Sequence, residues 1–353
     1  MDRLVNSITV AGRRIGPGHP CFVIAEAGVN HNGNLDFAKR LVDAAKEALA
    51  DAVKFQTFKA ERVATEGAPK AKYQLETTDS SQSQFEMLKR LELSEAQHRT
   101  LKTYCEEREI IFLSTPFDEA SADFLDSLGV AAFKVPSGEL TNTPLIRHVA
   151  KKNKPLIVST GMAYLQEVRA AVADIRAAGN KELVLLHCVS DYPAHPAQVN
   201  LLAIKTLSDA FGVPCGYSDH TLGIEIALAA MALGACVIEK HVTLSKELKG
   251  PDHRASLEPR EFKALVEGIR KVEQAFGNGV KAPAAGEQSN RKLVRRSLTL
   301  IKDVPRGALI EAGMLTALRP GDGISPSFFS KVIERRAKKA LSRGVQISWE
   351  DLE

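Results

Sequence analysis

The stretch Ala235-Cys-Val-Ile-Glu-Lys-His241 is a short apolar run that ends in ionisable residues, and Val213-Pro-Cys-Gly-Tyr-Ser-Asp-His220 has the same form. Apolar runs of this length are typical of buried β-strands. In a parallel α/β barrel the carboxyl ends of the strands carry the chemistry. Two imidazoles at neighbouring strand ends could hold one divalent metal and leave coordination positions open for substrate. Two unrelated histidines satisfied by hydrogen bonds are the alternative, and the rest of the chain argues against it.

Eight strand-like runs alternate with amphipathic stretches, of which residues 35–49 have apolar residues at helical spacing. Strand–helix alternation repeated eight times predicts a (β/α)8 TIM barrel. An open doubly wound sheet is the alternative, but no GxGxxG turn follows the first run. The predicted strands are Cys21–Glu26, Ala52–Gln56, Ile110–Thr115, Ala132–Val135, Leu156–Thr160, Leu183–Cys188, Val213–Ser218 and Cys236–His241.

Length and composition narrow the class of protein. The 353 residues suit one large domain and one small domain. The net charge of +4 is too small to predict nucleic-acid binding. Five cysteines without a Cys-x-x-Cys pair are typical of a reducing compartment. Neither a signal-peptide core nor a bilayer-spanning apolar stretch occurs. We therefore expect a cytoplasmic protein with no nucleic-acid or membrane partner.

Every predicted strand ends in a polar or ionisable residue, which predicts a ring of such groups at one mouth of the barrel. Two lysines in that ring suit a phosphate and a carboxylate. Buried lysines without anionic partners are costly, so either Glu26 and Glu239 or a ligand must supply counter-charge. The ring comprises Glu26, Lys54, Gln56, Ser114, Thr115, Lys134, Ser137, Ser159, Thr160, His187, Ser190, Ser218, His220, Glu239 and His241.

The domain boundaries follow from composition. Residues 1–280 are predicted to form the barrel, with residues 1–20 as an N-terminal extension. Small and polar residues predict a linker over 281–294, followed by a small domain over 295–353. The loop Gly250-Pro-Asp-His-Arg-Ala-Ser256 would display Asp252 beside the barrel mouth. Arg319, in a Pro-Gly loop, is the one candidate for chemistry in the small domain.

The motifs along the barrel resemble those of the sialic acid synthases, the family of N-acetylneuraminate and N,N'-diacetyllegionaminate synthases. The tail resembles the antifreeze-like SAF domain of that family, a β-clip fold, down to Arg319-Pro-Gly-Asp-Gly323. The matching strings in the barrel are Ile24-Ala-Glu-Ala-Gly28, Asn30-His-Asn-Gly33, Asp51-Ala-Val-Lys-Phe-Gln-Thr57, Ser114-Thr-Pro-Phe117, Lys134-Val-Pro-Ser-Gly-Glu139, Ser159-Thr-Gly-Met162, Tyr217-Ser-Asp-His-Thr-Leu-Gly223, Glu239-Lys-His241 and Gly250-Pro-Asp-His-Arg-Ala-Ser-Leu-Glu-Pro259.

The resemblance implies a condensation of phosphoenolpyruvate with an N-acylated mannosamine-type sugar. It implies a divalent ion on His220 and His241, usually Mn²⁺, with Mg²⁺ or Co²⁺ as alternatives. Glu26 would act on the attacking water. It also implies a homodimer with swapped SAF domains, in which Arg319 serves the partner's site. Phosphoenolpyruvate would bind Lys54, Ser114 or Thr115, Lys134, Ser137, Ser159, Ser190 and Ser218, and the sugar would bind Gln56, Tyr192, Asp252 and Arg319.

Several points stay open at this stage. Family members often carry an Asn where this chain has Ser190, which can still donate a hydrogen bond to the phosphate but reaches less far. A Schiff-base aldolase using Lys134 and a non-catalytic carbohydrate-binding protein are the alternative functions. The acceptor is either N-acetylmannosamine or 2,4-diacetamido-2,4,6-trideoxymannose, which differ at sugar carbons 4 and 6. The residues facing those carbons are expected within Lys70–Gln84.

Overall fold

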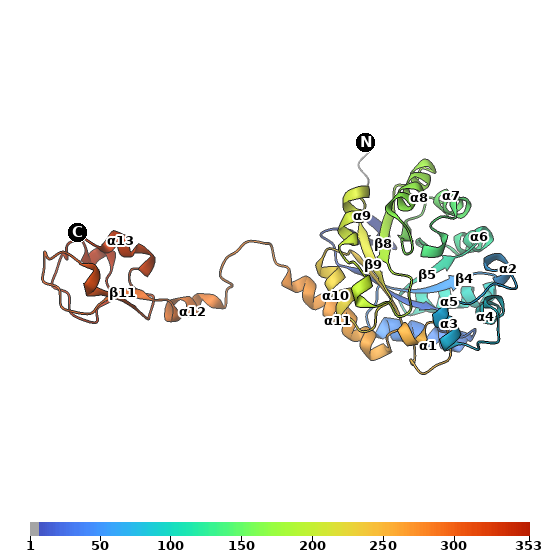
Figure 1. Cartoon of the computed structure of the whole chain (residues 1–353), viewed down its shortest axis with the longest axis horizontal. Coiled ribbons are helices and arrows are strands. Elements are labelled where there is room, and N and C mark those ends of the chain that lie inside the picture. Colours follow the sequence, from blue (N-terminus) through green and yellow to red (C-terminus); the bar gives the residue numbers. More distant parts are fainter. Residues whose placement is uncertain (1–6) are drawn as a thin grey trace. The chain divides into compact units, whose positions relative to one another are not determined.

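The computed structural model describes residues 7–353 and divides the chain into two compact units, Met1–Phe276 and Gly277–Glu353 (Figure 1). The first unit is the predicted barrel. Its eight strands are β3 (Phe22–Gly28), β4 (Ala52–Thr57), β5 (Ile111–Pro116), β6 (Phe133–Val135), β7 (Leu156–Ser159), β8 (Leu183–Cys188), β9 (Cys215–Asp219) and β10 (Val237–His241). All eight predicted strands are therefore present, with ends within two residues of the prediction.

The strands form one parallel sheet in the order β5-β4-β3-β10-β9-β8-β7-β6. Its two ends, β5 and β6, pack next to each other and so nearly close the barrel. Helices surround the strands in Figure 1. They are α1 (Leu35–Glu47), α5 (Glu95–Glu107), α6 (Glu119–Leu128), α7 (Thr143–Ala150), α8 (Leu165–Ala177), α9 (Ala203–Phe211), α10 (Glu225–Ala232) and α11 (Pro259–Ala275).

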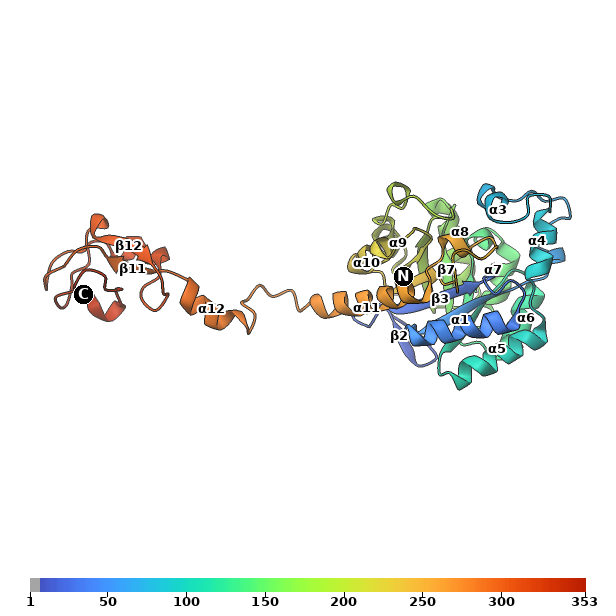
Figure 2. The same ribbon diagram turned by 90° about the horizontal axis from the view of Figure 1, so that it is seen from below.

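Local sequence signals set the helix ends. Ser94 caps α5, where its side chain accepts from the backbone N–H of Gln97 and the Gln97 side chain accepts from the Ser94 N–H. Three short helices lie between β4 and α5: α2 (Ala60–Val63), α3 (Lys72–Thr77) and α4 (Gln84–Leu91). Helices α3 and α4 lie at one edge of the barrel in Figure 2, and α2 packs against α4. No helix among residues 7–353 is both long and apolar enough to cross a bilayer.

The N-terminal extension forms a hairpin of β1 (Ile8–Val10) and β2 (Arg13–Ile15). Its three buried side chains, Ile8, Val10 and Ile15, join one apolar cluster with residues from the amino-terminal halves of the barrel strands, such as Phe22 and Ile157. The hairpin therefore closes the amino-terminal end of the barrel, and any functional opening must lie at the carboxyl-terminal end. Residues 1–6 lie outside the described part of the chain.

The second unit has its own apolar core, which includes Leu298, Ile310 and Ile347. It contains an antiparallel pair, β11 (Ser297–Leu300) and β12 (Leu315–Leu318), and the short helix α13 (Phe329–Val332). Helix α12 (Glu287–Val294) occupies much of the predicted linker. Its acidic first turn and basic last turn complement the helix dipole, a signal that the small, polar character of the surrounding residues obscured.

Candidate active site

The family resemblance assigns catalytic or binding roles to fifteen residues. Thirteen of them line one cavity of about 440 Å³ at the carboxyl ends of the strands. Side chains alternate between the two faces of a strand, so residues two apart at a strand end both reach the lumen. Glu239 with His241 on β10 and Lys54 with Gln56 on β4 show this spacing. The thirteen are Glu26, Lys54, Gln56, Thr115, Lys134, Ser137, Ser159, Ser190, Tyr192, Ser218, His220, His241 and Asp252.

Ser114 and Arg319 are the two candidates outside this cavity. The Ser114 hydroxyl lies 2.7 Å from Thr57 Oγ1 and is buried away from the lumen, because Thr115 takes the inward position on β5. Arg319 is exposed at the end of β12 in the second unit. Of the two residues proposed for one phosphoenolpyruvate contact, the structure therefore favours Thr115 over Ser114.

The two lysines carry protein carboxylates as partners. Lys54 Nζ lies 2.7 Å from Glu26 Oε2 and donates to Thr115 Oγ1 at 3.0 Å. Lys134 Nζ donates to Glu239 Oε1 at 3.1 Å, and Lys54 Nζ is 3.7 Å from the same oxygen. The protein thus supplies the counter-charge itself through Glu26 and Glu239, which was one of the two possibilities for these lysines, and Glu239 is the carboxylate that both lysines share.

Burial and neighbouring charges shift the pKa values of the two carboxyl groups and the two lysines in different directions. Burial raises the pKa of Glu239, but Lys134 and Lys54 outweigh it and hold that pKa at about 2. Burial raises the pKa of Glu26, and Lys54 offsets only part of the rise. Burial lowers the pKa of Lys134 despite Glu239, whereas Glu239 and Glu26 together overcome burial and raise the pKa of Lys54. Of these two carboxyls, only Glu26 has a pKa above its usual value, so it exchanges a proton more readily than Glu239.

Hydroxyl groups surround the lysines. Ser218 Oγ donates to Glu239 Oε1 at 3.1 Å. Ser159 Oγ is buried without a hydrogen-bond partner, so it is free to contact a ligand. Ser137 Oγ accepts from the backbone N–H of Gly161 at 3.0 Å. A Cβ at position 161 would lie 2.7 Å from Ser137 Oγ, so a glycine there permits this close approach of the β7–α8 loop.

The two histidines fit a metal site. His220 Nδ1 bonds to the carbonyl of Val189 at 2.7 Å, which leaves its Nε2 available as a ligand. His241 Nδ1 is buried and has no hydrogen-bond partner, and burial lowers the pKa of His241 far below its usual value, which favours the neutral imidazole. The ring centroids are 5.4 Å apart. Residues 7–353 include no cluster of three or more His, Cys, Asp or Glu side chains arranged around a metal, so the protein offers two imidazoles and an otherwise open site.

Two further predicted site residues, Tyr192 and Asp252, lie next to these imidazoles. The Tyr192 ring stacks on His220 with centroids 4.0 Å apart and meets the edge of His241 at 5.6 Å. Tyr73 on α3 stacks on Tyr192 at 5.0 Å. Asp252 Oδ2 lies 3.8 Å from His241 Nδ1, and burial raises the pKa of Asp252 to about 7. The loops carrying Tyr192 and Asp252 therefore converge on the histidine pair.

One side of the cavity is apolar, which the sequence did not predict. We call this side the apolar wall. It lies beside the polar residues Tyr73, Gln74 and Gln84, which fall in the stretch expected to face the acceptor. Apolar residues at helical spacing predict core packing equally well, so the sequence held no separate signal for this wall. The apolar wall consists of Val29, Phe58, Met87, Leu88, Leu91 and Phe117.

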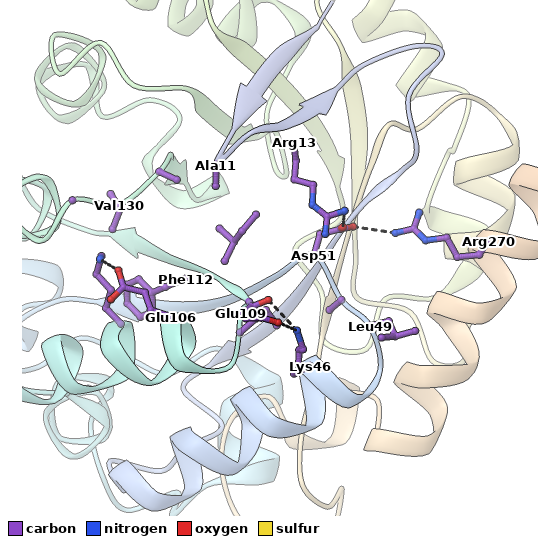
Figure 3. Close-up of a pocket in the computed structure, with 16 residues that line it drawn as sticks. Ala11, Arg13, Lys46, Leu49, Asp51, Glu106, Glu109, Phe112, Val130 and Arg270 are labelled. Atoms are coloured by element: carbon purple, nitrogen blue, oxygen red, sulfur yellow. Dashed lines mark hydrogen bonds and ion pairs between the residues drawn. The ribbon is translucent and has the colours of Figure 1, made fainter.

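A second hollow, of about 650 Å³, lies toward the amino-terminal ends of the strands (Figure 3). Asp51 lies between Arg13 and Arg270 there, at 3.1 Å from each. Its carboxylate also accepts from the backbone N–H of Val23 at 2.9 Å. Because these charges satisfy one another, the hollow offers a ligand less than the cavity at the opposite end.

Comparison with known proteins agrees with this geometry. The NeuB family matches residues 41–281, and the SAF domain matches residues 295–353. The chain belongs to the NeuB family. It is 51% identical to the N,N'-diacetyllegionaminic acid synthase of Legionella pneumophila over 356 residues, which cover 100% of this chain and 99% of the relative. It is 49% identical to the Campylobacter jejuni protein of the same name, over 90% of this chain and 96% of the relative.

The NeuB fold is also found among solved structures. An N-acetylneuraminic acid synthetase from Leptospira borgpetersenii serovar Hardjo-bovis, solved with citrate, matches with a TM-score of 0.73 and 35% identity. The match covers 82% of this chain and 96% of the solved one. The predicted family, TIM barrel and C-terminal SAF domain are confirmed, and the synthase is favoured over a Schiff-base aldolase or a non-catalytic binding protein.

Proposed function

We propose that this chain joins phosphoenolpyruvate to 2,4-diacetamido-2,4,6-trideoxymannose in a manganese-dependent condensation. Its class is that of a phosphoenolpyruvate-dependent synthase of nine-carbon sialic acids of the legionaminate or neuraminate type, because it shares that family over its full length. One observation carries the site assignment: two buried lysines and free hydroxyls share a cavity with two metal-competent imidazoles.

The anion would lie against Lys54 and Lys134. These ammonium groups, with Thr115, Ser137, Ser159, Ser190 and Ser218, form a cationic, hydroxyl-rich surface suited to a phosphate and a carboxylate. Preorganised donors of this kind stabilise charge without reorganising during the reaction. The free Ser159 hydroxyl fits a contact to an incoming oxygen anion, and Ser190 lines the same cavity.

His220 and His241 would hold the divalent ion, whose contribution when bound is to polarise the aldehyde oxygen of the open-chain sugar as a Lewis acid. Burial favours the neutral form of the His241 ring, and the Val189 carbonyl accepts from His220 Nδ1 and so leaves Nε2 of His220 to face the ion. Tyr192, Gln56 and Asp252 line the space next to them and would orient the sugar. Arg319 of a partner subunit's SAF domain would complete this set.

The reaction balances with groups in the cavity. Carbon 3 of phosphoenolpyruvate bonds to the aldehyde carbon, and the aldehyde oxygen takes up a proton and becomes a hydroxyl. Water adds to carbon 2 and gives up a proton, after which the bond from carbon 2 to the phosphate oxygen breaks. Glu26 lies between Lys54 and Gln56 Nε2, which donates to Glu26 Oε1 at 3.2 Å, and would receive the proton of that water.

The apolar wall supports the choice of acceptor. The trideoxy sugar carries a methyl group at carbon 6 and an acetamido group at carbon 4, where N-acetylmannosamine carries hydroxyls. Facing a hydroxyl with Phe58, Met87 and Leu91 leaves it unpaired, which is costly, whereas a methyl group gains from the contact. Gln84 Nε2 donates to Gln74 Oε1 at 3.5 Å, and these amides line the cavity beside the apolar wall, where they suit an acetamido group.

Phosphate release tests the function directly. With phosphoenolpyruvate and Mn²⁺ we expect faster release with the trideoxy sugar than with N-acetylmannosamine, no release after EDTA treatment, and recovery on adding Mn²⁺ back. Full turnover after EDTA, together with inactivation by borohydride in the presence of substrate, would support the Schiff-base mechanism on Lys134 instead. Equal kcat/KM for both sugars would contradict the acceptor assignment.

The Met87→Gln variant tests the wall. We expect kcat/KM for the trideoxy sugar to fall about tenfold or more, because a lost apolar contact of methylene size changes discrimination by roughly 1–3 kcal/mol. The value for N-acetylmannosamine should change less. Met162→Gln is the matched control, since Met162 is a methionine of the same cavity that lies on its exposed rim.

A further inference from the structure

Lys240 and Asp219 form an ion pair that is closed to solvent. Lys240 Nζ lies 2.6 Å from Asp219 Oδ2, and both side chains are 0% exposed. Neither residue lines the active-site cavity, because the residues on either side of each, Glu239 with His241 and Ser218 with His220, take the inward positions. The pair therefore lies on the outer face of the barrel wall, directly behind the histidine pair.

The strand register places this pair at one rung of the sheet. Lys240 is the register partner of Asp219, and Glu239 is the partner of Ser218. On the inner face Ser218 Oγ donates to Glu239 Oε1 at 3.1 Å. Side-chain bonds therefore join β9 to β10 on both faces of the sheet, directly before His220 and His241.

The pair also holds the backbone on both sides of His220. Asp219 Oδ1 accepts from the Thr221 N–H at 2.9 Å and from Thr221 Oγ1 at 2.8 Å. Lys240 Nζ donates to the Thr221 carbonyl at 2.5 Å. His220 therefore lies between two residues that are fixed to Lys240, while His241 is the next residue along the chain from Lys240.

Burying two charges costs about as much as their attraction returns, and well-packed apolar residues of similar size often stabilise a protein as well or better. Net stability therefore does not explain a fully buried pair at this rung. An apolar pair would lack the oriented hydrogen bonds by which this ion pair fixes Thr221 beside His220, in addition to the backbone ladders that set the register of β10.

We propose that Asp219 and Lys240 are positioning residues that set the separation and orientation of His220 and His241 for divalent-metal binding. The inference rests on the proposed metal site. It predicts that metal affinity falls when the pair is removed from a chain that still folds.

The test is the double substitution Asp219→Leu with Lys240→Met in the full-length chain, which removes both charges together. Mn²⁺ binding is measured by titration calorimetry and Tm by thermal unfolding without metal. We expect the double variant to remain folded at the temperature of the titration, with a lower Tm because Tyr217 and Thr221 lose their acceptor, and to lose at least tenfold in Mn²⁺ affinity. A folded double variant that binds Mn²⁺ as tightly as the native chain would overturn the proposal. A native chain that binds no Mn²⁺ would instead overturn the metal site itself.

Arg270→Met is the matched control, because it removes a partner of buried Asp51 at the other end of the barrel (Figure 3). It should lower Tm and leave Mn²⁺ affinity unchanged. If the double variant does not fold, the Thr221→Val variant tests the proposal instead, because it removes only the 2.8 Å hydrogen bond from Thr221 Oγ1 to Asp219 Oδ1. We then expect a severalfold loss of Mn²⁺ affinity, and an unchanged affinity would overturn the proposal.

Discussion

Lys134 Nζ donates a 3.1 Å hydrogen bond to Glu239 Oε1, and this bond joins β6 to β10 across the lumen of the barrel. The same oxygen accepts from Ser218 and lies 3.7 Å from Lys54 Nζ. Glu239 is therefore the counter-ion of the proposed anion site before substrate binds. When a trianionic substrate binds, both lysines would gain further partners. Before it binds, their charges are already compensated by protein carboxylates.

Glu239→Gln should destabilise the free protein and enlarge its response to phosphoenolpyruvate. Removing one partner of a buried ion pair costs about 3–5 kcal/mol, because the remaining charge is left uncompensated. Phosphoenolpyruvate would supply that compensation, so its thermal shift should exceed the shift seen with the native chain. Glu47→Gln, at the exposed end of α1, is the control. An equal thermal shift in Glu239→Gln and native protein would contradict the assignment of the anion to this site.

Lys54→Met and Lys134→Met should each raise the KM for phosphoenolpyruvate far more than the KM for the sugar. A hydrogen bond to a charged group contributes about 1.5–3 kcal/mol, so an increase of tenfold or more is expected for the anion. Steady-state kinetics with each substrate varied in turn provide the measurement. Lys46→Met, which removes a lysine of the opposite hollow, should change neither constant. Parallel increases for both substrates would argue that the lysines do not distinguish anion from sugar.

The barrel and most of its mouth follow from sequence because buried strands and polar strand ends are local signals. Ser114 and Thr115 show where the signal stops: both lie near the end of β5, and only the alternation of side chains along the strand decides that Thr115 faces the lumen. Met87 on α4 shows another limit, since an apolar residue at helical spacing looks the same whether it packs in a core or lines a cavity.

Acid should destabilise the barrel through His31, a buried residue that follows β3. Burial is the main cause that lowers the pKa of His31 from 6.5 to about 3, and its Nδ1 accepts from the Gly33 N–H at 2.9 Å. Between pH 6.5 and 3 the unfolded chain binds a proton here that the folded chain does not, so stability falls as pH falls. The slope is about 1.4 kcal/mol per pH unit for one proton.

The comparison of native protein with His31→Asn measures this contribution. From pH 6.5 to pH 4.5 the native chain should lose about 2–3 kcal/mol more unfolding free energy in urea than the variant does. His195→Asn is the matched control, because His195 Nδ1 also accepts from an N–H two residues on, that of Ala197, but the side chain is exposed. Identical pH dependence in His31→Asn and native protein would show that His31 does not carry the effect.

The SAF unit should act on the active site of a partner subunit through Arg319. This arginine is exposed at the end of β12, where its guanidinium is available to a sugar hydroxyl or carbonyl. Residues 277–286, between α11 and α12, contain neither helix nor strand. Ten residues of coil span about 15–20 Å, and more when stretched, which is enough to let the unit reach a neighbouring barrel.

Complementation between two inactive chains tests this arrangement. Arg319→Ala removes the SAF contribution, and His241→Ala removes one of two proposed protein ligands of the metal, so each homodimer should be nearly inactive. If the unit crosses over, a mixed dimer contains one site with both residues intact, and phosphate release should recover to as much as a quarter of the native rate after statistical subunit exchange. Native mass spectrometry establishes that heterodimers form. An Arg319→Ala homodimer that keeps full activity would mean that Arg319 serves no active site. Heterodimers without recovered activity would mean that Arg319 serves its own chain, because subunit exchange would then leave every barrel short of one residue that it needs.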